Sequence, residues 1–348
     1  MSHYQTREGA FESVLKDHLL DRGYKVVPNS EFDRDTALFP SEVLAFIQDT
    51  QPETWTKLEN LLGERTGEQV ITDLTKWLDD HGCLSTLRHG FKCYGRRLHV
   101  AYFRPVHGMN PDLQARYEAN RLGITRQLHY DPEHPKRSID TVLSVNGVPV
   151  ATAELKNPMT GSDVNDAIKQ YEEKRNPQAP LLRFKKRALV HFAVDPDEVH
   201  MTTRLAKGST TFLPFNKGIP LEGGRSRKGG NPPNPDGGYK TAYLWEEVWE
   251  KDSWMEILQR FIHIDTEEIK KDGITVEEDE TIIFPRYHQL ECVRQLVASA
   301  KEEGPGEDYL IQHSTGSGKS KSIAWLVHRL VSLHDDQDNA VFDGVVVV

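Results

Sequence analysis

A tight turn between two alternating segments constrains the fold of this chain most. Asn146-Gly147 is the strongest short signal for a β-hairpin, because both residues tolerate the positive φ values of a two-residue turn. On either side, residues 139–145 and 148–156 show the apolar and polar alternation of period two that marks a strand. We therefore predict two antiparallel strands joined at residues 146–147.

The register of this hairpin decides which side chains meet. Because the side-chain period of a strand is two, Glu154 and Lys156 project from the same face of the second strand. A plain two-residue turn would set Asp140 opposite Ala153, with the two acids facing opposite ways. One extra residue, in a three-residue loop or in a bulge at Pro149, sets Asp140 opposite Glu154. Proline cannot donate a ladder hydrogen bond, so we predict this offset register.

These three side chains have a common chemistry. Two carboxylates on adjacent strands offer the hard oxygen ligands that Mg²⁺ prefers, so Asp140 and Glu154 are the predicted metal ligands. The metal activates water and neutralises charge on a phosphodiester, while Lys156 orients or deprotonates that water and stabilises the anionic transition state. The alternative is an ordinary cross-strand salt bridge between Glu154 and Lys156, since the pattern also arises by chance.

The hairpin resembles the active-site signature of the PD-(D/E)xK nucleases. Its surroundings are similar to the motor-nuclease (R) subunits of type I restriction enzymes over most of the chain, notably at residues 126–158, 166–175, 187–203, 211–218 and 230–249. The resemblance implies an α/β fold. It consists of a PD-(D/E)xK core, in which a mixed sheet is flanked by helices with a helical insertion, followed by the start of a RecA-like parallel-sheet motor lobe.

The resemblance also implies further site residues. Members of the family carry a glutamine-tyrosine motif on the helix after the Glu-x-Lys strand, which supports the metal site and contacts DNA. Tyr171 matches the tyrosine, whereas Ala167 stands where many members have the glutamine, so Gln170 is the substitute. Glu12, on the first helix, matches an additional acid that nucleases of this fold often place near the metal. Its alternative is a solvated helix residue.

A second motif, at residues 308–330, predicts a nucleotide site. An apolar segment that we expect to be a strand leads through a glycine-rich turn into an amphipathic helix. Backbone N–H groups of such a turn cradle phosphate oxygens, the lysine reaches the β and γ phosphates, and the serine can ligate Mg²⁺. The predicted ATP-binding residues of this phosphate loop are Thr315, Gly316, Ser317, Gly318, Lys319 and Ser320.

The flanks of the phosphate loop resemble superfamily 2 helicases. His313 stands where the generic pattern has its first glycine, a form found in these helicases. Upstream, Gln289 and Arg286 match their adenine-reading segment. Residues 341–348 are predicted as the next buried parallel strand, but no Asp-Glu pair, second RecA-like lobe or arginine finger follows. We therefore expect these 348 residues to bind nucleotide weakly, without hydrolysing ATP or translocating DNA.

Turn and linker signals suggest two domains. Residues 1–258 are predicted to form an endonuclease domain, with a helical insertion at about 40–90 and a mobile loop at about 216–238, which is rich in glycine and proline. Residues 259–348 are the predicted beginning of the first RecA-like helicase/ATPase lobe. Further strands are expected at 97–104, 124–130 and 187–194, and helices at 8–23 and 162–175. Trp245, Trp249 and Trp254 are expected in the core.

Composition limits the partners and the compartment. A net charge of −10 argues against attraction of the whole molecule to DNA, so contacts with double-stranded DNA need local basic surfaces such as residues 183–187. The resemblance implies that methyltransferase (modification) and specificity subunits deliver the DNA. The three cysteines lack zinc spacing, and the sequence has neither a signal peptide nor an 18-residue apolar stretch. We expect a cytoplasmic protein without membrane contact.

Two functions therefore follow from the sequence. The first is the endonuclease and ATP-dependent DNA translocase subunit of a type I restriction-modification complex. The alternative is a helicase-like ATPase whose nuclease-shaped domain is degenerate and only binds DNA. The intact set of Asp140, Glu154 and Lys156 favours the first, because a module kept only for binding has no chemical need for all three. A cluster of His129 and His134 beside Asp131 and Glu133 is expected to be a polar loop at the lip of the active site rather than a transition-metal site.

Overall fold

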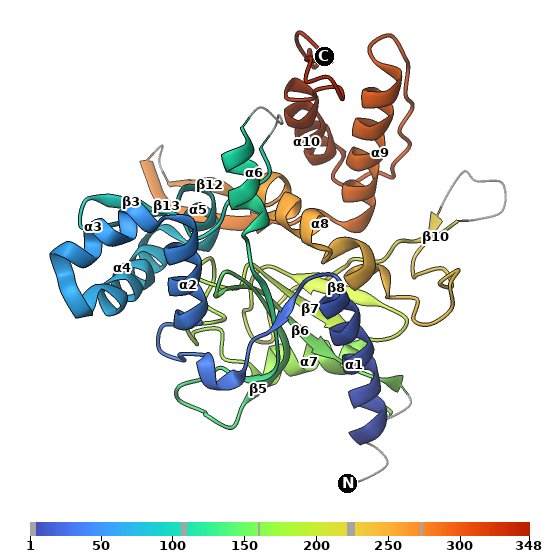
Figure 1. Ribbon diagram of the computed structural model, residues 1–348. Helices are drawn as coiled ribbons and strands as arrows, with labels where there is room; N and C mark the ends of the chain where they lie inside the picture. Colours follow the sequence, from blue (N-terminus) through green and yellow to red (C-terminus); the bar gives the residue numbers. More distant parts are fainter. Residues whose placement is uncertain (1–4, 106–109, 159–160, 221–226, 272–273) are drawn as a thin grey trace.

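A seven-stranded mixed sheet lies at the centre of the protein, in the order β1-β4-β5-β6-β7-β8-β9 (Figure 1). The computed structural model describes residues 5–105, 110–158, 161–220, 227–271 and 274–348. Strand β1 pairs in parallel with β4, and β6 with β7, whereas the other neighbours are antiparallel. The mixed α/β prediction is thereby confirmed. The strands are β1 (Lys25–Val26), β4 (Leu122–His129), β5 (Ser138–Val145), β6 (Val148–Leu155), β7 (Val190–Val194), β8 (Val199–Thr202) and β9 (Leu213–Pro214).

The β5–β6 hairpin has the offset register predicted from its sequence. Its turn has two residues, but the pairing shifts by one residue directly after Pro149, where β6 forms a bulge. Beyond the bulge Thr141 pairs with Ala153, so the next position sets Asp140 opposite Glu154. The extra residue is therefore accommodated by a bulge and not by a longer turn. Both strands are almost wholly buried, which fixes this register.

The hairpin turn is packed into the protein. Gly147 has a φ of +83°, and a Cβ atom there would lie 2.5 Å from the carbonyl oxygen of Phe39. Asn146 is fully buried, and its side chain accepts from the backbone N–H of Arg121 at 2.6 Å and donates to the carbonyl of Val100 at 2.9 Å. The turn is thus held by side-chain hydrogen bonds as well as by the two strands.

Helices cover both sides of the sheet (Figure 1). Helix α1 (Gln5–Asp21) contacts β6, and α7 (Val164–Lys169) forms the crossover from β6 to β7. Helix α7 continues as a π-helix, η4 (Gln170–Lys174). Helices are present at 40–90, where they were predicted, and gather on one side in Figure 1: α2 (Pro40–Thr50), α3 (Pro52–Leu62), α4 (Thr66–His81) and α5 (Cys83–His89).

The largest hydrophobic cluster extends from α1 to the C-terminal helices. Trp245, Trp249 and Trp254 are fully buried in it, as predicted. They lie in and between the π-helix η5 (Leu244–Val248) and α8 (Lys251–Glu256), which is followed by the π-helix η6 (Ile257–Phe261). Smaller elements are η1 (Asn29–Glu31), η2 (Gly63–Arg65) and α6 (Pro111–Glu118). None of the described helices combines the length and the apolar character needed to cross a membrane.

The C-terminal part contains one hairpin and two long helices. Strands β12 (His263–Lys271) and β13 (Ile274–Ile283) form a two-stranded sheet that was not predicted. Helices α9 (Tyr287–Glu303) and α10 (Lys319–Val331) then stand side by side beyond α8 (Figure 1). Trp325 of α10 joins the large cluster, so this helix pair packs on the same core as the sheet.

Three strand predictions were wrong. Residues 308–313 and 341–348 form no strand, and Leu310 and Val346 are 95% and 86% exposed. Parallel strands need hydrogen-bonding neighbours and cover on both faces, and no strand among the described residues pairs with these segments. In place of a strand at 97–104, only β3 (Arg96–Leu98) forms, paired with β2 (Phe91–Cys93) outside the main sheet.

The segment 216–238 has more structure than the predicted mobile loop. Strands β10 (Ile219–Pro220) and β11 (Arg227–Lys228) pair within it. Asn231 is buried and donates to the carbonyl of Asp197 at 2.9 Å, while its own side-chain oxygen accepts from the backbone N–H of Lys217. The hydrogen bonds of a buried asparagine thus hold this segment against the rest of the protein. Residues 221–226 lie outside the described residues.

Candidate functional site

Asp140 and Lys156 lie together at the end of the β5–β6 hairpin. Asp140 Oδ2 accepts a hydrogen bond from the backbone N–H of Leu155 at 2.8 Å, and Lys156 Nζ lies 3.9 Å from the same oxygen. Asp140 Oδ1 accepts from the amide of Gln127 at 3.0 Å. The side chains of Asp140 and Lys156 are 13% and 12% exposed, so a ligand can reach this corner from solvent.

Glu154 is fully buried and is held by two side chains from the crossover helix. Arg175 places Nε and Nη2 at 2.6 Å from Oε1, and Gln170 donates from Nε2 to Oε2 at 2.8 Å. Arg175 was not singled out in the sequence, where it follows a run of charged residues that is typical of a solvated helix end. The structure instead directs it inward, with its side chain only 5% exposed.

The electrostatics of this corner are dominated by burial. Burial, followed by the negative charge of Asp140, raises the pKa of the Glu154 carboxyl to about 8, although Arg175 opposes the rise. Burial lowers the pKa of Arg175, but the charge and hydrogen bond of Glu154 outweigh it and raise that pKa overall. Two acids thus share a desolvated corner with cationic groups on either side.

Glu12 belongs to the same network. It is 7% exposed, pairs with Arg126 of β4 and accepts from Nε2 of Gln127 at 2.8 Å. The same amide nitrogen reaches Asp140, so Gln127 bridges the acid on α1 and the acid on β5. The alternative of a solvated helix residue is therefore wrong for Glu12.

Gln127 has a strained backbone. Its φ is +48°, in the left-handed region that non-glycine residues rarely adopt, inside a strand. Such strain persists where the surrounding structure imposes it, and it is frequent at functional sites. No feature of the sequence marks Gln127, because its role depends on a contact between three elements that are distant along the chain.

Gln170 and Tyr171 point to different places. The Tyr171 hydroxyl lies 2.7 Å from Thr152 Oγ1, which in turn lies 2.8 Å from His191 Nδ1. Burial lowers the pKa of His191 to about 3, so its imidazole is neutral. Tyr171 therefore anchors the π-helix to β6 and β7, while Gln170, the substitute in the family motif, makes the contact with Glu154.

The donor set of the corner fits a hard divalent cation. Asp140 and Glu154 bring carboxylate oxygens from adjacent strands, and Mg²⁺ is usually held by one or two carboxylates together with water and phosphate oxygens. Asp131, Glu133 and His134 also bring three ligand atoms within 4.8 Å of one another. Asp131 accepts there from the backbone N–H groups of Glu133 and His134, which is the hydrogen bonding expected of a polar loop.

The phosphate loop precedes α10 as predicted. Gly316 and Gly318 have φ values of +77° and +81°, and Ser320 lies in the first turn of the helix. Lys319 Nζ donates to the carbonyl of Ser314 at 3.0 Å. Thr315, Gly316 and Ser320 are exposed, so the loop is accessible to a ligand.

Of the two predicted adenine-reading residues, Gln289 lies against this loop, and Arg286 is the N-cap residue of α9. Gln289 donates from Nε2 to the carbonyls of Ser317 and Gly318, at 3.3 and 3.1 Å. Its Oε1 accepts from the backbone N–H of Arg286 at 2.9 Å. Residues that lie 29 positions apart in the sequence are thus in direct contact, although the strand expected before the loop is absent from the described residues.

The fold and this corner define a mixed α/β protein with a carboxylate and lysine site on its central sheet. The family description "type I restriction enzyme R protein N terminus" matches residues 5–210, more than half of the chain. The chain belongs to this family. The matched range contains Glu12, Asp140, Glu154, Lys156 and Gln170, and it ends before the phosphate loop. A search of curated proteins gives no match.

Proposed function

We propose that this chain carries the nuclease activity of a type I R subunit and hydrolyses phosphodiester bonds of double-stranded DNA with Mg²⁺, on a PD-(D/E)xK-type core. The observation that supports this proposal most is the bulge after Pro149. It sets Asp140 opposite Glu154, next to a lysine amine 3.9 Å from Asp140. A plain hairpin of the same sequence would have separated the two acids.

Each side chain of the corner has a role in this proposal. Asp140 and Glu154 would hold the ion, which when bound supplies an activated water and offsets the charge of the phosphodiester. Lys156 orients the attacking water and stabilises the anionic phosphate. Arg175 and Gln170 fix the orientation of the Glu154 carboxylate, because Arg175 contacts Oε1 with two N–H groups and Gln170 contacts Oε2 with one. An acceptor site on Oε2 is left for the ion.

The wider activity would require other parts of a complex. Methyltransferase and specificity subunits deliver the DNA in this proposal, and ATP bound at the phosphate loop drives translocation. The loop supports this through Lys319, Ser320 and the contact with Gln289. A RecA-like lobe is proposed from this motif alone, since the described residues contain only its two helices.

The catalytic assignment is tested in the assembled restriction complex. We expect Asp140→Ala and Lys156→Ala to lower the rate of DNA cleavage by about 100-fold or more, since each removes a group that acts on the transition state. ATP-driven translocation should continue at the wild-type rate in both variants. Lys57→Ala, which changes an exposed lysine on α3, is the matched control and should cleave normally.

Either variant cleaving at the wild-type rate while translocating normally would contradict the assignment. That result would support the alternative, a helicase-like ATPase with a nuclease-shaped domain that only binds DNA. Loss of translocation together with cleavage would instead show that the complex had not assembled, and circular dichroism of the isolated variants separates this case.

The 348-residue chain alone should bind ATP weakly and should not hydrolyse it. Gln289 and Lys319 donate to backbone carbonyls of the loop, so nucleotide binding must replace these contacts. The check is phosphate release from ATP with and without duplex DNA, with Lys319→Ala as the background. DNA-stimulated turnover by the wild-type chain, absent in the variant, would contradict this expectation.

A further inference from the structure

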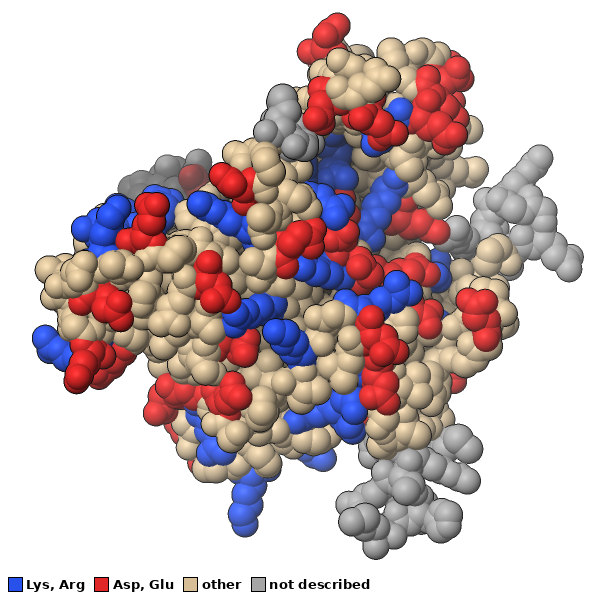
Figure 2. Space-filling view, viewed as in Figure 1, with Lys and Arg blue, Asp and Glu red and all other residues tan. Residues whose placement is uncertain are grey.

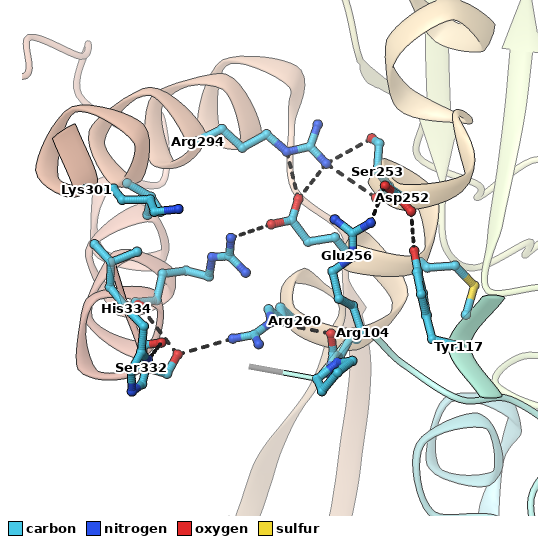
Figure 3. A pocket seen from close by; sticks show the side chains of 16 residues that line it. Arg104, Tyr117, Asp252, Ser253, Glu256, Arg260, Arg294, Lys301, Ser332 and His334 are labelled. Atoms are coloured by element: carbon cyan, nitrogen blue, oxygen red, sulfur yellow. Dashed lines mark hydrogen bonds and ion pairs between the residues drawn. The ribbon is translucent and has the colours of Figure 1, made fainter. Parts of the chain in front are cut away.

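A cleft separates the C-terminal helices from the sheet-bearing part of the protein. It encloses a cavity of about 550 Å³, lined by residues of α8 and η6 on one side and of α9 and α10 on the other (Figure 3). Figure 2 shows Lys and Arg side chains gathered in the recess beneath the helix pair. The cavity shares no residue with the site formed by Asp140, Glu154 and Lys156 on β5–β6, which we call the acidic corner.

The lining of the cleft has the opposite charge to the protein as a whole. Five cationic side chains face it, against two carboxylates, which leaves an excess of three positive charges on a chain whose net charge is −10. The cations are Arg104, Arg260, Arg294, Lys301 and Arg329, and the acids are Asp252 and Glu256. Charge of one sign in a concave site attracts ligands of the other.

The carboxylates are shared among several of the cations. Glu256 accepts from Arg294 Nε at 2.9 Å through one oxygen and from Arg329 Nη2 at 2.6 Å through the other (Figure 3). Arg104 Nη2 lies 2.6 Å from Asp252. One carboxylate thus neutralises two guanidinium groups only in part, and both groups keep N–H donors for a ligand.

Arg260 has no carboxylate partner of its own. Among the described residues it makes no ion pair, and its hydrogen bonds to Ser332 Oγ and Gln259 Oε1 are long, at 3.3 and 3.4 Å. Burial lowers the pKa of Arg260, and the nearby charge of Arg329 lowers it further. Two like charges therefore repel each other inside the cleft. Lys301 pairs with Asp336, whose side chain is 91% exposed, so solvent screens this pair.

We propose that this cleft binds a small anion with two or more adjacent phosphate groups, such as the polyphosphate chain of a nucleotide. With Asp336 counted against Lys301, two positive charges remain uncompensated within about 550 Å³, and they call for a ligand of comparable charge density, which adjacent phosphates provide. Guanidinium groups match phosphate oxygens with pairs of N–H donors. A cavity of this size admits a small molecule and not a DNA duplex.

The lining also argues against recognition of a base. Tyr117 and His334 are the two residues with aromatic rings among the described lining residues. Arg104 and Lys251 lie over its ring at 5.3 and 5.6 Å from the centroid, and Tyr117 is 1% exposed. The Tyr117 ring is therefore closed to stacking, and guanidinium groups outnumber rings in the lining, so the phosphate groups carry the recognition.

The cleft is lined by both helices of the candidate nucleotide site, α9 and α10. Helix α10 begins at the phosphate loop with Lys319 and brings Arg329 to the cleft in its last turn. Gln289 lies in the first turn of helix α9, and the middle and last turns of this helix bring Arg294 and Lys301 to the cleft. An anion in the cleft thus ties both helices of the candidate nucleotide site to α8 and η6.

Calorimetric titration of the whole chain with tripolyphosphate tests the proposal. The titration uses a Lys319→Ala background, which removes the phosphate-loop lysine and so isolates the cleft. We expect one saturable site. Arg260→Gln should weaken binding about 10- to 100-fold, the amount contributed by one or two charge-assisted hydrogen bonds. Arg260→Lys should retain part of the affinity, and Arg96→Gln, which changes an exposed arginine on β3, should leave it unchanged.

Arg260→Gln is a safe variant for folding, because it removes the repulsion with Arg329 and breaks no ion pair within the described chain. Lys301→Gln is the second variant and should also weaken binding.

Absence of saturable binding, or equal binding by wild type and Arg260→Gln, would overturn the proposal. Equal affinity for hexaglutamate, or displacement of tripolyphosphate by a lower concentration of a short single-stranded oligonucleotide, would also overturn it. None of these results depends on DNA cleavage, so this proposal and the nuclease proposal can fail separately.

Discussion

The acidic corner and the phosphate loop are both short motifs, but the structure supports them differently. Asp140 and Glu154 lie on buried strands that are paired on both sides within the seven-stranded sheet. The phosphate loop follows an exposed segment, with Leu310 95% exposed, and its contacts come from one neighbouring helix. A motif identifies a chemistry, whereas its geometry depends on the elements that surround it.

The largest expected difference between the two regions concerns one arginine–carboxylate pair in each, of which only the pair in the acidic corner is buried. Arg175→Met should lower the free energy of unfolding by about 3 to 5 kcal/mol, because it leaves the fully buried Glu154 without its partner. Arg329→Met breaks a pair with Glu256 in which both side chains are more than one-fifth exposed, and should cost about 1 kcal/mol or less. Denaturant unfolding of both variants measures the difference.

A compensating variant sharpens this test. Adding Glu154→Leu to Arg175→Met removes the uncompensated charge and should recover most of the lost stability. Equal losses in Arg175→Met and Arg329→Met would mean that the acidic corner is no more desolvated than the surface of the helix pair, contrary to the burial described above.

The contrast between Arg175 and Pro149 shows what the sequence could predict. The bulge could be predicted, because an Asn-Gly turn, a proline and a period of two are local properties of one segment. Arg175 and Gln127 could not, because each acquires its role from side chains on other elements, Glu154 on β6 and Glu12 on α1.

The same distinction holds for the larger elements. The amphipathic helices of the insertion at 40–90 were predicted from their apolar periodicity and were confirmed. The apolar run 341–348 has a strong strand composition, yet it forms no strand, because pairing depends on neighbours that composition does not encode. Tyr171 was matched to the tyrosine of a family motif and Gln170 was the substitute for its glutamine. In the structure Gln170 contacts Glu154 and Tyr171 contacts Thr152, a division that the motif alone does not give.

The next largest difference is expected for one substitution made at two glycines. Gly147→Ala should cost about 3 kcal/mol, since the left-handed φ is strained and the new Cβ would lie 2.5 Å from the Phe39 carbonyl oxygen. Gly316→Ala has a similar φ, but no atom lies within 4 Å of its Cβ position, so about 1 kcal/mol is expected from strain alone. Thermal or denaturant unfolding ranks the two. A larger loss for Gly316→Ala would show that the loop is the more tightly packed region.

The smallest effect is a difference in cysteine reactivity. Burial raises the pKa of Cys83 and of Cys93 to about 12, and both are fully buried in the sheet-bearing part. Burial and Glu291 also raise the pKa of Cys292, but this residue on α9 is partly exposed. Alkylation requires both a thiolate and access, so Cys292 should react first in the native protein at pH 8, while all three cysteines react in denaturant.

Mass spectrometry of the alkylated chain over time gives the order of labelling. Alkylation of the buried Cys83 requires local opening of α5, whereas the partly exposed Cys292 on α9 is reached more directly. The ratio of the two rates therefore measures how strongly the fold protects Cys83. If Cys83 reacts as fast as Cys292, α5 is no better protected than α9, contrary to the difference expected between the two regions. If tripolyphosphate slows labelling at Cys292 alone, the ligand stabilises α9, as expected for an anion that binds Arg294 and Lys301 of the same helix.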